Sequence, residues 1–134
     1  MAEYLLDTNH TSAAICKVAP LRERIIQADR KGNVFGTCIP LLCELETGIV
    51  QTAEVADNRR RLTQLLKIVR LWPIDRELSI LFGELAVELR QAGRMLSFVD
   101  VMLAAMARPK SLTLLTTDGD FRGVRGLKTK NWLK

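Results

Sequence analysis

The chain has 134 residues, of which 48% are apolar and 26% charged, and its formal net charge is +5. This length and composition suit one globular domain with a core, and they exclude disordered and fibrous classes. Three cysteines without a C-x-x-C spacing and a single histidine leave no basis for a disulfide framework, a zinc site or a Ser-His-Asp triad. Early acidic residues argue against a signal peptide, and no apolar run is long enough for a membrane span, so we expect a cytoplasmic protein.

Expected strands and helices alternate through the first half of the chain. We predict a strand over 2–6, a turn over 7–9, helices over 11–17 and 21–29, a strand over 34–38, and helices from 40 to about 52 and over 54–68. Gly32 and Asn33 end the second of these helices, and Pro40 favours the first turn of the third.

The second half continues the alternation. We predict a strand over 69–74, a helix that Asp75 caps and Gly93 ends, a helix over 97–108 and a strand over 112–116, with 127–133 as a candidate short last strand. Strands separated by helices favour a parallel sheet covered on both faces. The prediction is therefore one α/β domain over residues 1–134.

Two aspartates follow predicted strands. Asp7 closes the first strand, and Asp118 follows the strand that ends at Thr116. Parallel sheets bind ligands beyond the carboxyl ends of their strands, so both carboxylates could reach one site. The competing local interpretation is that each is a helix cap or an Asx turn.

Two further acids lie on predicted helices. Glu44 shares a helix face with Leu45 and Gly48, at the border of a core stripe. Asp100 opens a strongly apolar helix, where a buried carboxylate needs a partner such as a metal ion. Ser97 and Asp100 equally fit a capping box, in which the acid bonds back to the Ser97 amide. Spacing alone does not separate these two interpretations.

Collected carboxylates suit a divalent metal. Magnesium prefers hard oxygen ligands, uses one or two protein carboxylates and keeps several waters. Such an ion can supply a nucleophile from water and neutralise charge on a phosphate. Together with the positive net charge, this chemistry points to a phosphodiester substrate.

Four short motifs in this order resemble the PIN domain, and within it the VapC-type toxin ribonucleases. They are Leu6-Asp7-Thr8-Asn9, Glu44-Leu45-x-x-Gly48, Asp100-x-x-x-Ala104-Ala105-x-Ala107 and Thr116-x-Asp118-x-Asp120-Phe121. The motifs span the chain from one end to the other. The resemblance implies a three-layer α/β/α sandwich with a central parallel sheet of four to five strands.

The resemblance also implies a function. It predicts a Mg²⁺-dependent endoribonuclease, with Mn²⁺ as a possible substitute, that acts as the toxin of a type II toxin–antitoxin pair. It further implies RNA as substrate, a cognate VapB-like antitoxin and a homodimer. The residues would take these roles: Asp7 and Asp100 as metal ligands and catalytic acids, Glu44 and Asp118 completing the catalytic pocket, and Asn9 and Thr116 holding these side chains, with Asp120 as an alternative to Asp118.

Two departures from the family pattern stand out. Thr117 occupies a position where the family often has Asn, and Ser97-Phe98 replaces a stretch that commonly contains proline or glycine. One rival hypothesis is a non-catalytic module that binds RNA or a protein partner. A second rival, a phosphatase with an aspartate nucleophile, suffers because Asp7-Thr8-Asn9 lacks a second aspartate.

Overall fold

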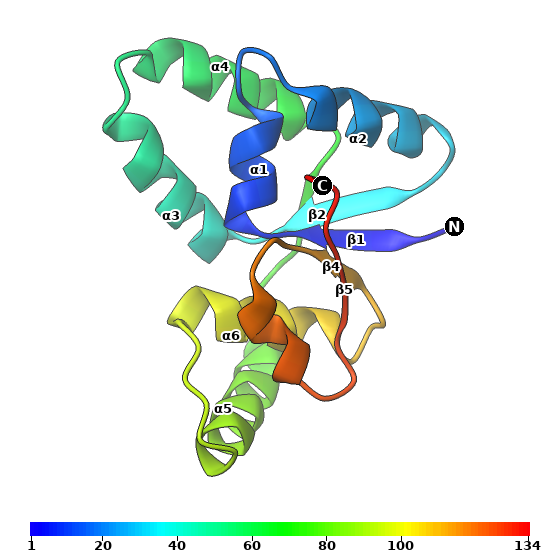
Figure 1. Cartoon of the computed structure of the whole chain (residues 1–134), viewed down its shortest axis with the longest axis vertical. Helices are drawn as coiled ribbons and strands as arrows, with labels where there is room; N and C mark the ends of the chain where they lie inside the picture. The colour runs from blue at the N-terminus through cyan, green and yellow to red at the C-terminus, as the bar shows by residue number, and fades with distance from the viewer.

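Five short strands form one sheet in the order β3-β2-β1-β4-β5 in the computed structural model, which describes residues 1–134 (Figure 1). The strands are β1 (Glu3–Leu6), β2 (Val34–Thr37), β3 (Arg70–Leu71), β4 (Thr113–Leu115) and β5 (Lys128–Lys130). Every neighbouring pair is parallel. All strands therefore present their carboxyl ends at the same edge, as the sequence predicted.

Helices cover both faces of this sheet. They are α1 (Thr8–Ala14), α2 (Pro20–Arg30), α3 (Ile39–Val50), α4 (Val55–Leu65), α5 (Arg76–Gln91) and α6 (Phe98–Ala107), with a 3₁₀ helix η1 (Gly119–Gly123) after β4. In Figure 1, α1 to α4 lie above the sheet and α5, α6 and η1 lie below it. The predicted three-layer α/β/α architecture is confirmed.

The alternation of side chains along each strand divides the core into two clusters. Leu5 and Leu114 point into the cluster under α5 and α6, whereas Leu6 and Leu115 point into the cluster under α1 to α4. Both faces of the central strands are therefore buried, which explains why their sequences are continuous apolar runs rather than alternating ones.

Helix α6 is buried almost along its whole length. Its sequence is apolar on all sides, and only Phe98 and Asp100 remain outside the buried set. Alanines at 104, 105 and 107 keep the helix close to its neighbours. A helix that is apolar all round must lie inside the protein. Its deep position fixes its first turn, and so Asp100, at the edge of the sheet.

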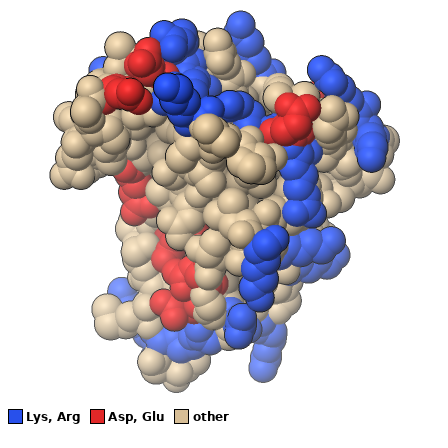
Figure 2. Space-filling model, turned by 45° about the horizontal axis from the view of Figure 1, so that its top comes forward, with Lys and Arg blue, Asp and Glu red and all other residues tan.

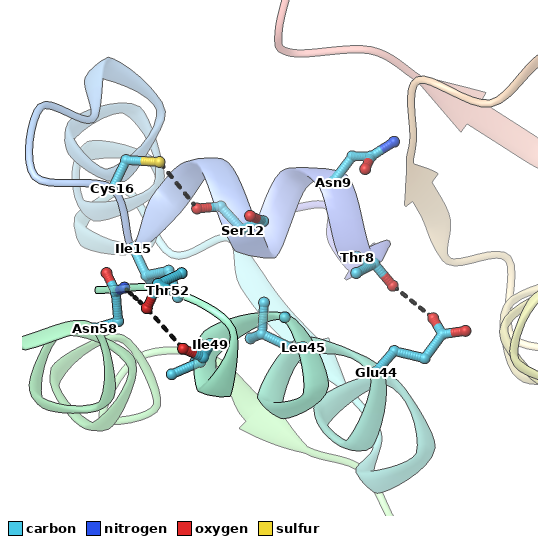
Figure 3. A pocket seen from close by; sticks show the side chains of 11 residues that line it. Thr8, Asn9, Ser12, Ile15, Cys16, Glu44, Leu45, Ile49, Thr52 and Asn58 are labelled. Carbon is cyan, nitrogen blue, oxygen red and sulfur yellow. Dashed lines mark hydrogen bonds between the residues drawn. The ribbon is translucent and has the colours of Figure 1, made fainter. Parts of the chain in front are cut away.

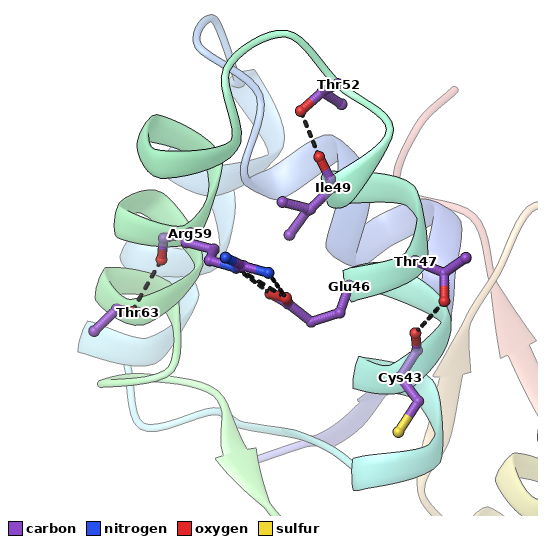
Figure 4. A network of polar contacts seen from close by, with 7 residues as sticks. All are labelled: Cys43, Glu46, Thr47, Ile49, Thr52, Arg59 and Thr63. Carbon is purple, nitrogen blue, oxygen red and sulfur yellow. Dashed lines mark hydrogen bonds and ion pairs between the residues drawn. The ribbon is translucent and has the colours of Figure 1, made fainter.

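Helices α3 and α4 are joined by an ion pair on the surface. Arg59 Nη2 lies 2.9 Å from Glu46 Oε2 (Figure 4). Arg61 on the same helix donates a hydrogen bond to the backbone carbonyl of Ile15. An exposed ion pair contributes little to stability. The partly buried bond from Arg61 ties α4 to the end of α1.

Two elements differ from the prediction in their extent, and one element was not predicted. Helix α1 begins at Thr8 rather than at residue 11, because the Asp7 side chain accepts from the Thr8 amide and caps the helix. The predicted strand 69–74 pairs only through Arg70 and Leu71, since Pro73 has no N–H to donate. The candidate last strand is confirmed over Lys128–Lys130, and η1 was not predicted. None of the helices has the length and apolar character needed to cross a membrane.

Candidate active site

Four acids from distant segments meet at the carboxyl edge of the sheet. Asp7 follows β1, Asp118 follows β4, Asp100 lies in the first turn of α6 and Glu44 lies on α3. Their charges affect one another: Asp7, Asp118 and Glu44 all help to raise the pKa of Asp100. On the face drawn in Figure 2, several acidic side chains lie left of centre and in the lower middle, and Lys and Arg gather to their right and below them.

Asp7 is the most enclosed of the four and is only 6% exposed. Its Oδ1 accepts from the Thr8 amide at 2.6 Å, and its Oδ2 accepts from the Thr116 hydroxyl at 2.6 Å. Burial raises the pKa of Asp7, as do the charges of Asp118 and Glu44, while the two hydrogen bonds lower it. The carboxylate is therefore fixed in orientation and close to other negative charge.

Asp100 combines a helix-start position with a perturbed acidity. The Ser97 hydroxyl accepts from the Asp100 amide at 3.2 Å, which is half of a capping box. No bond from the Ser97 amide to the Asp100 carboxylate completes the box, and the Ser97 side chain only partly offsets the rise in the pKa of Asp100. Burial, followed by the charge of Asp7, raises the pKa of Asp100 to about 6.

Glu44 is held by a residue outside the predicted supporting set. The Thr8 hydroxyl donates a 2.9 Å hydrogen bond to Glu44 Oε1 (Figure 3). Thr8 therefore places its backbone N–H on Asp7 and its hydroxyl on Glu44. The position of Thr8 directly after Asp7 could have suggested a supporting role. We predicted a turn there, and a turn does not indicate that the Thr8 side chain faces α3.

Asp118 and Asp120 differ in their surroundings. The Asp118 carboxylate caps η1 by accepting from the Asp120 amide at 2.8 Å, and the Asp118 amide donates to the Thr116 hydroxyl at 3.0 Å. Only Asp118 contributes to the raised pKa values of Asp7 and Asp100. Asp120 is exposed. The electrostatics favour Asp118 as the fourth member of the acidic group.

The two predicted supporting residues behave differently. Thr116 contacts Asp7 directly, as expected. Asn9 instead donates to the Thr117 hydroxyl at 2.8 Å and reaches no carboxylate. Thr117, one of the departures from the family pattern, thus takes part in a bond that joins α1 to the segment after β4.

The donor set fits a hard divalent cation. Its members are carboxylate oxygens, and their mutual repulsion at neutral pH is relieved by positive charge. No three of these side chains approach closely enough to form a ready-made cage. Magnesium needs only one or two protein carboxylates and completes its shell with water, so it does not require such a cage.

Comparison with known proteins defines the class of this fold and site. Residues 4–127 match the sequence profile of the PIN domain. The chain belongs to the PIN domain family, and the predicted family is confirmed.

Individual relatives sharpen this assignment. The chain is 26% identical over 132 residues to Ribonuclease VapC2 of Rickettsia felis, covering 98% of each protein. It is 27% identical over 92 residues to Ribonuclease VapC5 of Mycobacterium tuberculosis, covering 67% of this chain and 68% of that protein.

Solved structures agree with the fold. The crystal structure of VapBC2 from Rickettsia felis bound to a DNA fragment has a TM-score of 0.85 at 25% identity, over 97% of this chain and 98% of that one. DNA-bound VapBC from Salmonella typhimurium has a TM-score of 0.83 at 22% identity, over 98% and 99% of the two chains.

Proposed function

We propose that the chain is a metal-dependent endoribonuclease and the toxin of a type II toxin–antitoxin pair. The observation that carries this proposal is the convergence of Asp7, Glu44, Asp100 and Asp118 at one edge of a PIN-domain sheet. The similarity to two ribonucleases of the VapC type supports RNA as the substrate.

Asp7 and Asp100 are the metal ligands in this proposal. Both carboxylates are partly withdrawn from water and lie near other acids, so a bound cation stabilises their ionised forms. Mg²⁺ is the proposed ion, with Mn²⁺ as a substitute. Glu44 and Asp118 complete the pocket, either at the ion or through water.

The chain's own residues supply orientation and charge. Thr116 and Thr8 hold Asp7 and Glu44 by hydrogen bonds, so the carboxylates need little reorganisation when substrate binds. When bound, the ion supplies a water nucleophile and neutralises charge that develops on the phosphate. Two basic residues belong to segments next to this edge of the sheet, and their positive charge would assist binding of a polyanionic substrate. Lys130 accepts at its backbone from Thr116, and Arg94 donates to the backbone of Asp120.

The proposed antitoxin partner follows from relatives that were solved as VapBC complexes, whereas the proposed homodimer follows from the resemblance to the family alone. VapBC2 from Rickettsia felis and VapBC from Salmonella typhimurium were both solved with DNA. By extension, we expect this chain to bind a small VapB-like antitoxin and to form a homodimer.

Two experiments test the proposal. In the first, the chain is induced in bacteria; in the second, an extract of those cells is assayed for RNA cleavage with and without EDTA. We expect growth arrest and new RNA 5′ ends, both lost with Asp7→Asn, and no cleavage in the presence of EDTA. RNA binding that persists with EDTA, without cleavage under any metal condition, would instead establish the non-catalytic module.

A further inference from the structure

A pocket of about 280 Å³ lies between α1 and α3, beside the acidic group (Figure 3). Thr8 and Glu44 belong both to its wall and to the candidate active site. Thr52 and Asn58 line its other end. A water molecule occupies roughly 30 Å³ of liquid, so the pocket has room for a group of several heavy atoms held next to the reacting phosphate.

Gly48 opens this pocket without any structural need for glycine. It lies in the last turn of α3, ahead of the cap residue Gln51 and not at the later position where glycine ends helices. Its φ is not positive, and a Cβ added there would meet no atom within 4 Å. Glycine disfavours a helix. What the missing side chain does provide is empty space, because Gly48 lines the pocket.

The remaining lining combines an apolar wall with uncommitted polar groups. Leu45 and Ile49 form buried apolar surface on α3. The exposed Ser12 hydroxyl makes no hydrogen bond within the protein, and Asn9 uses its side-chain N–H on Thr117, which leaves its carbonyl oxygen free. An apolar surface with a few free polar groups is typical of pockets that bind small organic groups.

The opposite wall is rigid. Asn58 donates to the Thr52 hydroxyl at 3.0 Å, and that hydroxyl donates to the Ile49 carbonyl at 2.6 Å (Figure 3). Arg61 donates to the other side of the Asn58 amide at 2.6 Å. This network joins the end of α3 to α4, and the pocket is therefore present in the structure without a ligand.

We infer that this pocket is a nucleobase subsite, which takes the base of a nucleotide adjacent to the cleaved phosphodiester of single-stranded RNA. The inference rests on the proposed ribonuclease function. Proteins that read single-stranded RNA accept splayed-out bases and bond their edges. Here Ser12 and Asn9 offer those bonds, Gly48 provides room for the ring, and the shared Glu44 keeps the base next to the acids.

Filling the pocket at Gly48 tests the inference, and Gly83 provides the matched control. Gly83 is an exposed glycine of α5 whose added Cβ would also meet nothing within 4 Å, and it does not line the pocket. The purified wild type, Gly48→Leu and Gly83→Leu are each incubated with Mn²⁺ and an RNA pool that carries a randomised single-stranded stretch. Cleavage rates and the bases beside each cut are read by sequencing the 5′ ends.

We expect Gly48→Leu to cleave the wild type's preferred sites more slowly by about tenfold or more, with unchanged Mn²⁺ affinity. Gly83→Leu should match the wild type. Ser12→Ala should alter the base preference beside the cut more than the overall rate. Circular dichroism checks that each variant folds. If Gly48→Leu does not fold, the cleavage rate and base preference of Gly48→Ala are compared with those of the wild type instead.

The wild-type rate and base preference in Gly48→Leu would overturn the subsite. A Gly48→Leu variant that changes only the affinity for a protein partner would also overturn the subsite, because the pocket would then be a docking site for that protein. If the wild type leaves the pool intact with Mn²⁺, the ribonuclease proposal fails and the subsite falls with it, which is a distinguishable result.

Discussion

The hydroxyl of Thr116 donates a 2.6 Å hydrogen bond to Oδ2 of Asp7, across 109 positions of sequence. The Thr116 hydroxyl oxygen also accepts a hydrogen bond from the backbone amide of Asp118 at 3.0 Å. One side chain therefore joins the ends of β1 and β4 and orients two of the four acids. This link explains how a sheet edge, rather than a loop, sets the geometry of the site.

Removing that hydroxyl should weaken metal binding and activity. In Thr116→Val, Asp7 loses a bond that lowers its pKa and fixes its orientation. Loss of such a supporting contact typically costs about 10- to 100-fold in metal affinity or activity. Calorimetric titration with Mn²⁺ and the rate of RNA cleavage measure the two effects.

Thr37→Val is the matched control for this change. Thr37 is also a buried threonine at a strand end, but its hydroxyl donates to the backbone carbonyl of Leu6 rather than to an acid. We expect it to lower the free energy of unfolding by about 1 kcal/mol and to leave Mn²⁺ affinity unchanged. Equal losses of metal affinity in both variants would contradict the special role of Thr116.

Thr8→Val should loosen Glu44 without disturbing Asp7. The backbone N–H that bonds Asp7 is retained, whereas the hydroxyl that bonds Glu44 is lost. Because Asp7 and Asp100 are the principal proposed ligands and both are retained, we expect a loss in cleavage rate of about tenfold and a smaller change in Mn²⁺ affinity. A variant indistinguishable from the wild type in both assays would remove Thr8 from the site.

Asp100→Asn should stabilise the protein when metal is absent. The pKa of Asp100 is about 6 in the native protein, against an ordinary value of 3.8. Between these values the native state binds more protons than the unfolded state, so the contribution to stability falls as pH rises. At pH 7.5 without metal, the variant should be more stable than the wild type by ~1 kcal/mol, because solvent screening of this partly exposed carboxyl removes much of the free energy that the shift would carry in a buried site.

Urea unfolding with EDTA, repeated from pH 7.5 down to pH 3.8, measures this difference. It should shrink on acidification as the wild-type carboxyl becomes protonated. Saturating Mn²⁺ should reverse the order, because only the wild type retains both proposed ligands. A variant less stable than the wild type with EDTA at pH 7.5 would show that the Asp100 carboxylate is not under repulsion.

His10 should titrate far below the usual range. Burial, with a smaller effect of the Arg24 charge, lowers its pKa to about 4, and its Nε2 accepts from the Trp132 amide at 3.0 Å. Between pH 6.5 and about 4 the unfolded state binds the proton and the native state does not, so this group's contribution to stability is lost as pH falls.

Proton NMR can follow His10 alone, since it is the only histidine. An imidazole signal that titrates near pH 4 is expected. A titration midpoint near pH 6.5 would mean that the imidazole ring is exposed and that its hydrogen bond from the Trp132 amide is not formed. The NMR readout is preferable to bulk unfolding, because Asp100 acts with the opposite sign in part of the same pH range.

The candidate site could be predicted where an acid follows an apolar strand, because the parallel sheet brings the ends of its strands to one edge. Asp7 and Asp118 follow apolar strands, and a parallel sheet brings such positions together. The competing cap interpretation was also correct, since both carboxylates cap the helix that follows. Capping and a shared site are therefore compatible, because each carboxylate has a second oxygen or lone pair available.

Other features required the tertiary structure. The face of α1 that carries Thr8 depends on where the helix begins, and Asp7 shifted that start by three residues from the predicted position. The role of Asn9 depends on the chain after β4, which lies 108 positions away. The short pairing of β3 reflects Pro73 and its exit from the sheet. Contacts between distant segments leave little trace in local sequence patterns.

The most direct test of the central claim is metal-dependent cleavage of RNA by the purified chain and two aspartate variants. Asp7→Asn removes a proposed ligand. Asp75→Asn is the control, because Asp75 caps α5 and asparagine is an equally good helix cap. With Mg²⁺, the wild type and Asp75→Asn should cleave at equal rates, and Asp7→Asn should be inactive while folded. Cleavage by Asp7→Asn at the wild-type rate, or wild-type cleavage that persists with EDTA, would contradict the account.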